Sequence, residues 1–169
     1  ADEIRMAEDQ TDHLEDVIGS YLVKISTKQL NDHEGATASM LLKAIGDFER
    51  ISDHAVNILE SAEEMQDKGL FFSEKAKLEI EYLSKATLEI LDMSYLTFVN
   101  SDVQQATLVE PLEQVIDRMK EILRSRHIDR LRVGECGIEM GFVWSDLITN
   151  MERVSDHCSN IAVCIIEIA

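Results

Sequence analysis

The sequence predicts an all-α protein of five long antiparallel helices, and both composition and periodicity support this fold class. The 169 residues include one proline and seven glycines, and only 5% of them are aromatic, which is typical of long helices and not of an all-β sandwich. Apolar residues recur with the 3.6-residue period of amphipathic helices. No segment has the alternating pattern of a strand bounded by turn residues.

Turn and capping residues divide the chain into these helices. The turn segment NDHEGA, which contains Gly35, separates the first two. Gly69 is expected to follow the end of the second helix, and Ser73 to cap the third. Asp102 begins a capping-box pattern for the fourth, and Pro111 predicts a kink or a late start of that helix because proline cannot donate a backbone hydrogen bond. The predicted helices span about 2–29, 36–66, 74–100, 102–133 and 138–169.

An internal repeat organises the chain. ERISDHAVNI at 49–58 returns as ERVSDHCSNI at 152–161, 103 residues later, with seven of ten positions identical. Upstream, EDQTDHLEDVI at 8–18 aligns with EQVIDRMKEIL at 113–123, at an offset of 105. Because the two offsets nearly agree, we expect two copies of one helical hairpin.

The repeat predicts two units, 1–69 and 70–169. The second is led by the helix at 74–100, whereas the first has no leading helix in this chain. The helical pattern begins by about Glu3 and the first residue is Ala1, so we expect a fragment of a longer protein, although a processed N-terminus gives the same pattern. The truncated first unit leaves an apolar face that a second copy could cover, which predicts a possible homodimer.

The charge of the chain restricts its partners. The formal net charge of −17 disfavours nucleic acid, whose binding needs clustered Lys and Arg, and anionic membrane for the same reason. Cations or a basic partner surface are the expected counterparts. The longest apolar stretch, IAVCIIEIA, is too short to span a bilayer. The three cysteines form no C-x-x-C pair, which favours a reducing cytoplasmic setting.

Paired carboxylates four residues apart are the main candidate site, because that spacing places both on one helical face. Each repeat has two such E-x-x-x-D pairs on adjacent antiparallel helices. If their faces meet, four carboxylates converge in each repeat, which is stable around divalent or trivalent cations. The candidate metal ligands are Glu8, Asp12, Glu49, Asp53, Glu113, Asp117, Glu152 and Asp156.

Simpler interpretations stay open for these residues. With 33 acidic residues in the chain, a single E-x-x-x-D pair is usually a solvated face, and only the matched repetition favours a site. His54 and His157, with the arginines four residues before them, either orient the carboxylates or are polar residues of a helix–helix seam. The basic segment 120–132 could receive an anion or an acidic partner, but a solvated helix face is the simpler interpretation.

The motifs disfavour an enzyme. Ferritin-like di-iron sites need an E-x-x-H step, and the residues three after the four glutamates are Thr11, Ser52, Ile116 and Ser155. The chain has no glycine-rich phosphate loop and no nucleophile elbow.

The doubled motifs DxERISDHAxNI and MERVSDHCSNI resemble the signature of PhoU-domain proteins, regulators of phosphate uptake. RHIDRLRVGECGIEMGFVWSDLITNMERVSDHCSNI is similar to the C-terminal cytoplasmic PhoU-like region of bacterial sodium/phosphate cotransporter-type proteins. The resemblance implies two three-helix bundles packed as pseudo-repeats. It also implies one iron, zinc or other metal cluster at Glu8, Asp12, Glu49 and Asp53 and another at Glu113, Asp117, Glu152 and Asp156. Because the first bundle lacks its leading helix, its cluster is expected to be incomplete or exposed.

These expectations lead to a first hypothesis of a non-enzymatic PhoU-like regulatory domain. It would lie on the cytoplasmic side of the inner membrane and act on a sodium-dependent phosphate transporter domain, expected in the same full-length chain. A second hypothesis is a free-standing metal-binding adaptor of phosphate signalling. A carboxylate di-metal oxidoreductase is a distant third. The metal, the direction of regulation and any binding of phosphate are not determined by the sequence.

Overall fold

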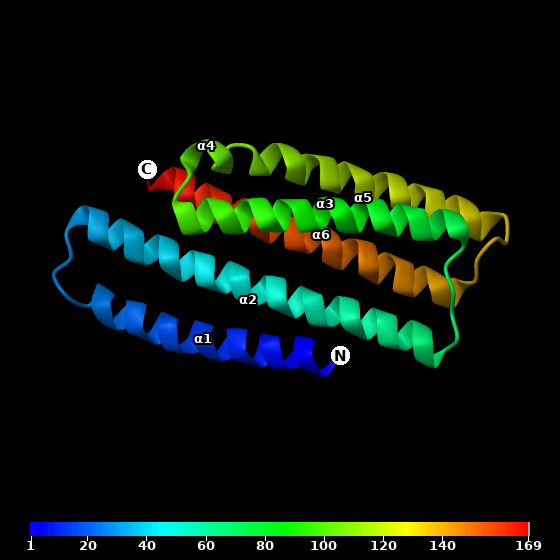
Figure 1. Ribbon diagram of the computed structural model, residues 1–169, viewed down its shortest axis with the longest axis horizontal. Coiled ribbons are helices and arrows are strands. Elements are labelled where there is room, and N and C mark those ends of the chain that lie inside the picture. Colours follow the sequence, from blue (N-terminus) through cyan, green and yellow to red (C-terminus); the bar gives the residue numbers. More distant parts are fainter. Residues whose placement is uncertain (169) are drawn as a thin grey trace.

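The computed structural model describes residues 1–168, in which six helices, five of them long, account for nearly the whole chain (Figure 1). No strand is present in these residues, so the predicted all-α class is confirmed. The helices are α1 (Asp2–Ser26), α2 (Asp32–Asp67), α3 (Glu74–Asn100), α4 (Val103–Ala106), α5 (Val109–Arg132) and α6 (Ile138–Glu167).

The long helices lie roughly side by side along one axis (Figure 1). Helices α3, α5 and α6 contact one another as a three-helix bundle, and α4 turns the corner between α3 and α5. Helix α2 packs along α6. Among the described residues, α1 contacts no helix other than α2, so it forms one edge of the molecule. The division into units 1–69 and 70–169 stays a prediction.

Helix α2 begins four residues earlier than the sequence predicts. Asn31 Oδ1 accepts a hydrogen bond from Glu34 N at 2.9 Å, and Glu34 Oε2 accepts one from Asn31 N at 2.9 Å. This capping box satisfies two backbone donors that a helix start would otherwise leave unpaired. Gly35 therefore lies inside the helix and not in the turn, and the expectation for NDHEGA is wrong in this respect.

The other boundaries follow the predicted signals. Gly69, with φ of +61°, follows the end of α2, and Ser73 Oγ accepts from Ala76 N at 3.3 Å to cap α3. Asp102 Oδ1 accepts from Gln105 N at 3.0 Å and caps the short α4. The regular helix α5 then starts two residues before Pro111, where a missing N–H costs no intrahelical bond. The late start that Pro111 predicts is confirmed.

The core lies between α3, α5 and α6. Its fully buried side chains include Leu83, Ile90, Ile116, Trp144 and Cys158. Helix α6 is the central element, since it packs against α2, α3, α4 and α5. The three cysteines are free thiols, and burial raises the pKa of Cys158 to about 12. Cys158 therefore acts as a small apolar core residue, as its correspondence with Ala55 in the repeat predicts.

The edge helix α1 keeps much of its apolar surface exposed. Leu14, Ile18 and Tyr21 remain 55%, 40% and 63% exposed, whereas Leu22 is buried. In the second repeat, the helix corresponding to α1 is α5, which packs against α3 as well as α6. No helix within residues 1–168 is both long and apolar enough to cross a bilayer.

Candidate functional site

The first carboxylate row consists of Glu8 and Asp12 on α1 and Glu49 and Asp53 on α2. The two helices run antiparallel as a hairpin (Figure 1). This brings Glu8 close to Asp53, and the charge of Asp53 contributes to raising the pKa of Glu8. The sequence-predicted residues of this row are therefore on facing helices, as the repeat suggested.

Desolvation and mutual repulsion raise two pKa values in the first carboxylate row. The pKa of Glu8 is raised first by burial against the hairpin and then by the charges of Asp9, Asp53 and Asp12. The pKa of Glu49 is likewise raised by burial first, then by Asp53. Within residues 1–168, no member of this row takes part in an ion pair. The first carboxylate row is thus a set of neighbouring acids that form no ion pair with a basic side chain.

The second carboxylate row consists of Glu113 and Asp117 on α5 and Glu152 and Asp156 on α6. Burial, followed by the charge of Asp156, raises the pKa of Glu113. Burial, followed by the charge of Glu152, raises the pKa of Asp156. The four side chains occupy the same places on their hairpin as the first row does on its own.

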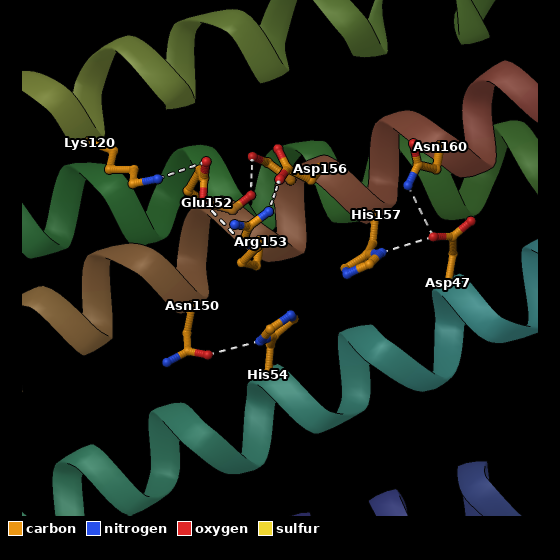
Figure 2. Close-up of polar contacts among 10 residues, drawn as sticks. Asp47, His54, Lys120, Asn150, Glu152, Arg153, Asp156, His157 and Asn160 are labelled. Atoms are coloured by element: carbon orange, nitrogen blue, oxygen red, sulfur yellow. Dashed lines mark hydrogen bonds and ion pairs between the residues drawn. The ribbon is translucent and has the colours of Figure 1, made fainter.

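Cations accompany the second carboxylate row, which distinguishes it from the first. Lys120 Nζ lies 2.8 Å from Glu152 Oε1, and Arg153 Nη1 lies 3.1 Å from Asp156 Oδ2. Figure 2 shows both contacts along α6. Glu152 Oε2 is buried without a hydrogen-bond partner, with Arg153 Nε 3.9 Å away.

Neither carboxylate row has the geometry of a preformed metal centre. In the part of the chain that the structure describes, no three Asp, Glu, His or Cys side chains are arranged to hold one metal ion. The oxygen donors suit hard divalent cations, but the side chains would have to move together to coordinate one. Metal binding by the eight predicted residues stays a prediction.

The two histidines form a separate polar cluster at the seam between α2 and α6. Their rings stack with centroids 5.6 Å apart and an interplanar angle of 25°. His54 Nδ1 donates to Asn150 Oδ1 at 2.8 Å, and His157 Nδ1 donates to Asp47 Oδ1 at 2.8 Å (Figure 2). Each acceptor oxygen requires a proton on Nδ1, which fixes the tautomer of both rings. The seam interpretation of the histidines therefore holds, and neither ring hydrogen-bonds to a carboxylate row.

This histidine seam follows the internal repeat. Asp47 and Asn150 occupy corresponding positions 103 residues apart, as do His54 and His157. Asn160 Nδ2 adds a second donor to Asp47 Oδ1 at 3.2 Å. The E-x-x-x-D spacing does not include Asp47 and Asn150, so the sequence analysis missed them, although a comparison of the two copies position by position pairs them.

The basic segment 120–132 is partly buried, although Arg124, Arg126 and Arg132 are exposed. Arg130 is buried, and its Nη1 donates to Glu79 Oε2 at 2.7 Å while its guanidinium lies 4.9 Å from the Trp144 ring centroid. Burial and then the charge of Arg130 lower the pKa of His127. Arg130, His127 and Trp144 line a cavity of about 600 Å³ at the end of the bundle. Because Glu79 already neutralises the charge of Arg130, this part of the basic segment belongs to the interior of the fold.

Comparisons with known proteins agree on one family. A family model described as the PhoU domain matches residues 1–62 and 80–165. The chain is 32% identical over 127 residues to the phosphate-specific transport system accessory protein PhoU homolog 1 of Thermotoga maritima, covering 72% of this chain and 51% of the relative. It therefore spans about half the length of that curated relative.

The fold is shared with a solved structure. The crystal structure of PhoU from Pseudomonas aeruginosa matches with a TM-score of 0.91 at 20% identity, covering 99% of this chain and 79% of that chain. At this identity the likeness supports the helical fold and not a common activity.

Proposed function

Because the chain belongs to the PhoU domain family, we propose that it is a non-enzymatic regulatory module of a phosphate-transport system. The family match over both repeats carries this proposal. The name of the Thermotoga maritima relative, an accessory protein of phosphate transport, supports it.

The target of the module is proposed to be a sodium-dependent phosphate transporter domain in the same full-length chain, with the module on the cytoplasmic side of the inner membrane. The resemblance of residues 126–161 to the PhoU-like region of such proteins supports this choice. Sequencing the gene upstream of the codons for these residues tests this choice. Several encoded apolar segments of about twenty residues each would be the membrane-spanning helices of the transporter. An upstream start codon without such segments would favour the free-standing adaptor.

The proposed regulation uses a cation at the first carboxylate row. Glu8, Asp12, Glu49 and Asp53 would hold an iron, zinc or other divalent or trivalent ion, which would neutralise their repulsion. Because α1 contacts only α2 among the described helices, drawing the carboxylates together would change how α1 sits on α2. Metal occupancy would then alter the surface that the transporter meets.

Phosphate uptake in the source cells tests the regulatory proposal. We expect deletion of the coding region for residues 1–169 to change the rate of radiolabelled phosphate uptake when phosphate is plentiful. Restoring the region should restore the rate. Unchanged uptake, in cells where the transporter is still present in equal amount, would contradict the proposal.

Elemental analysis of protein purified without chelator tests the metal proposal. We expect bound iron, zinc or manganese that falls when Glu49→Gln removes a ligand charge at the α1–α2 hairpin. Glu89→Gln is the matched control, because Glu89 is an exposed acid on α3 outside both rows. Metal well below one ion per chain after reconstitution, or equal loss in both variants, would rule the site out. Oxidase activity of an iron-loaded protein would favour the oxidoreductase hypothesis instead.

A further inference from the structure

The two carboxylate rows differ in the charge of one neighbouring side chain. In the second row, the ammonium of Lys120 on α5 lies 2.8 Å from Glu152 Oε1 on α6 (Figure 2). The Lys120 and Glu152 side chains keep only 16% and 9% of their exposure, so the pair is largely removed from water. At the offset of 105 residues, the first repeat has Glu15 at the position of Lys120.

The charge of Glu15 acts on the residue that corresponds to Glu152. The charge of Glu15 is one of those that raise the pKa of Glu49, and Glu49 precedes Glu152 by 103 residues. The charge at this position of the hairpin therefore repels the neighbouring glutamate in the first repeat and attracts it in the second. Arg50, the counterpart of Arg153, partly offsets the repulsion in the first repeat, because its charge lowers the pKa of Glu49.

A metal ion at the second carboxylate row would have to compete with side chains already in place. Glu152 is bonded to Lys120, and Asp156 is bonded to Arg153 at 3.1 Å. A divalent cation bound to Glu152 would stand beside the ammonium of Lys120 in a site with little water to screen the repulsion. Moving Lys120 away would break a buried ion pair, which is costly for the partner left behind.

We propose that Lys120 is the resident cation of the second carboxylate row, which therefore takes up no metal ion and stabilises the α5–α6 hairpin instead. The two repeats then have different roles, and the expectation of a metal cluster in each repeat is replaced by one row open to metal, at the first hairpin. The structural role of Lys120 stands on the geometry of the ion pair alone. The statement about metal rests on the proposed function.

Thermal unfolding in the presence of EDTA tests the structural role without metal. Lys120→Met keeps the apolar stem but leaves Glu152 buried without its partner, and we expect Tm to fall by roughly 5–15 °C. Lys85→Met is the matched control, because Lys85 pairs with Glu81 at an exposed site and should shift Tm by less than about 2 °C. Lys120→Arg, which keeps the charge, should retain most of the stability. Equal shifts for Lys120→Met and Lys85→Met would overturn the structural role.

A reciprocal charge exchange tests the metal statement, with bound Mn²⁺ measured by equilibrium dialysis and elemental analysis. We expect Glu15→Lys to weaken Mn²⁺ binding about tenfold or more, because it places an ammonium in the open row. Lys120→Glu should add a second class of sites. If the wild-type protein binds two Mn²⁺ ions per chain and Glu152→Gln removes one, the second row binds metal and the inference is overturned. If the wild-type protein binds no Mn²⁺, the proposed metal function fails, and the Tm comparison still decides the role of Lys120.

Discussion

The two hydrogen bonds of the histidine seam allow a sharp comparison of a charged acceptor with a neutral one. Both bonds are 2.8 Å long, and they occupy corresponding places in the repeat. His157 donates to the carboxylate of Asp47, whereas His54 donates to the amide of Asn150. Their geometry is matched, so the difference in stabilisation reports the acceptor.

The expected magnitudes follow from the acceptor chemistry. Asp47→Ala removes a charged acceptor from two donors, His157 and Asn160, and a hydrogen bond to a charged group contributes about 1.5–3 kcal/mol. Asn150→Ala removes a neutral acceptor, for which the contribution is about 0.5–1.5 kcal/mol, together with an exposed hydrogen bond from Asn150 Nδ2 to the Asp146 carbonyl at 2.8 Å, which should add little. We therefore expect Asp47→Ala to lower the free energy of unfolding by about 1–2 kcal/mol more than Asn150→Ala.

Urea unfolding followed by far-UV circular dichroism at pH 7.5 measures this difference. Asp92→Ala is the control for simple removal of one negative charge, because Asp92 is an exposed acid on α3. Asp47→Asn should lower the free energy of unfolding by about 0.5–1.5 kcal/mol less than Asp47→Ala, since it keeps a neutral acceptor like that of Asn150. If Asn150→Ala costs as much as Asp47→Ala, or Asp92→Ala costs as much as either, the reasoning about the seam is refuted.

Three further outcomes are expected. Gly141→Ala should be about 1–3 kcal/mol less stable than Gly35→Ala in the same urea assay. Both glycines are the fourth residue of a helix, but a methyl group at 141 would lie 3.1 Å from His127 Nε2, whereas one at 35 would meet no atom within 4 Å. Equal stabilities of the two variants would contradict this expectation. In EDTA, lowering the pH from 7.5 towards 5.5 should change Tm more favourably in the wild-type protein than in Glu49→Gln, since the raised pKa of Glu49 means that it binds a proton more tightly in the folded than in the unfolded state. The opposing contribution of His127, whose pKa is lowered, is common to both proteins; an equal change in Tm would contradict the raised pKa of Glu49. The Cys158 thiol, buried and with its pKa raised to about 12, should resist iodoacetamide at pH 8 until the protein unfolds, as mass spectrometry can determine.

Local signals predicted the helices well, and their errors have a local cause. Pro111 and Ser73 marked their boundaries because proline and N-cap residues act within one turn of the chain. Gly35 misled the prediction because a glycine in a polar segment usually indicates a turn. Here the reciprocal bonds of Asn31 and Glu34 start the helix before it.

The sequence predicted only those features of the site that depend on the spacing of residues along one helix and on the repeat. The spacing of Glu49 and Asp53 is a property of one helix, and the repeat extended it to the facing helices. The ion pair of Lys120 with Glu152 depends on how α5 and α6 lie against each other, which no periodicity specifies. The bond of His157 to Asp47 joins residues 110 apart in sequence, and it required knowledge that α2 packs on α6.

The histidine seam gives a single chain the reciprocity of a two-fold dimer interface. Position 54 on α2 contacts 150 on α6, and 157 on α6 contacts 47 on α2, so each half offers the other a histidine donor and receives one in return. Because α2 and α6 run in opposite directions (Figure 1), sliding one helix by a turn of about 5.4 Å would break both bonds and separate the stacked rings together. The seam therefore acts as a register lock. Translation of α2 along α6 would therefore cost both hydrogen bonds at once, whereas a pivot about this point could keep them.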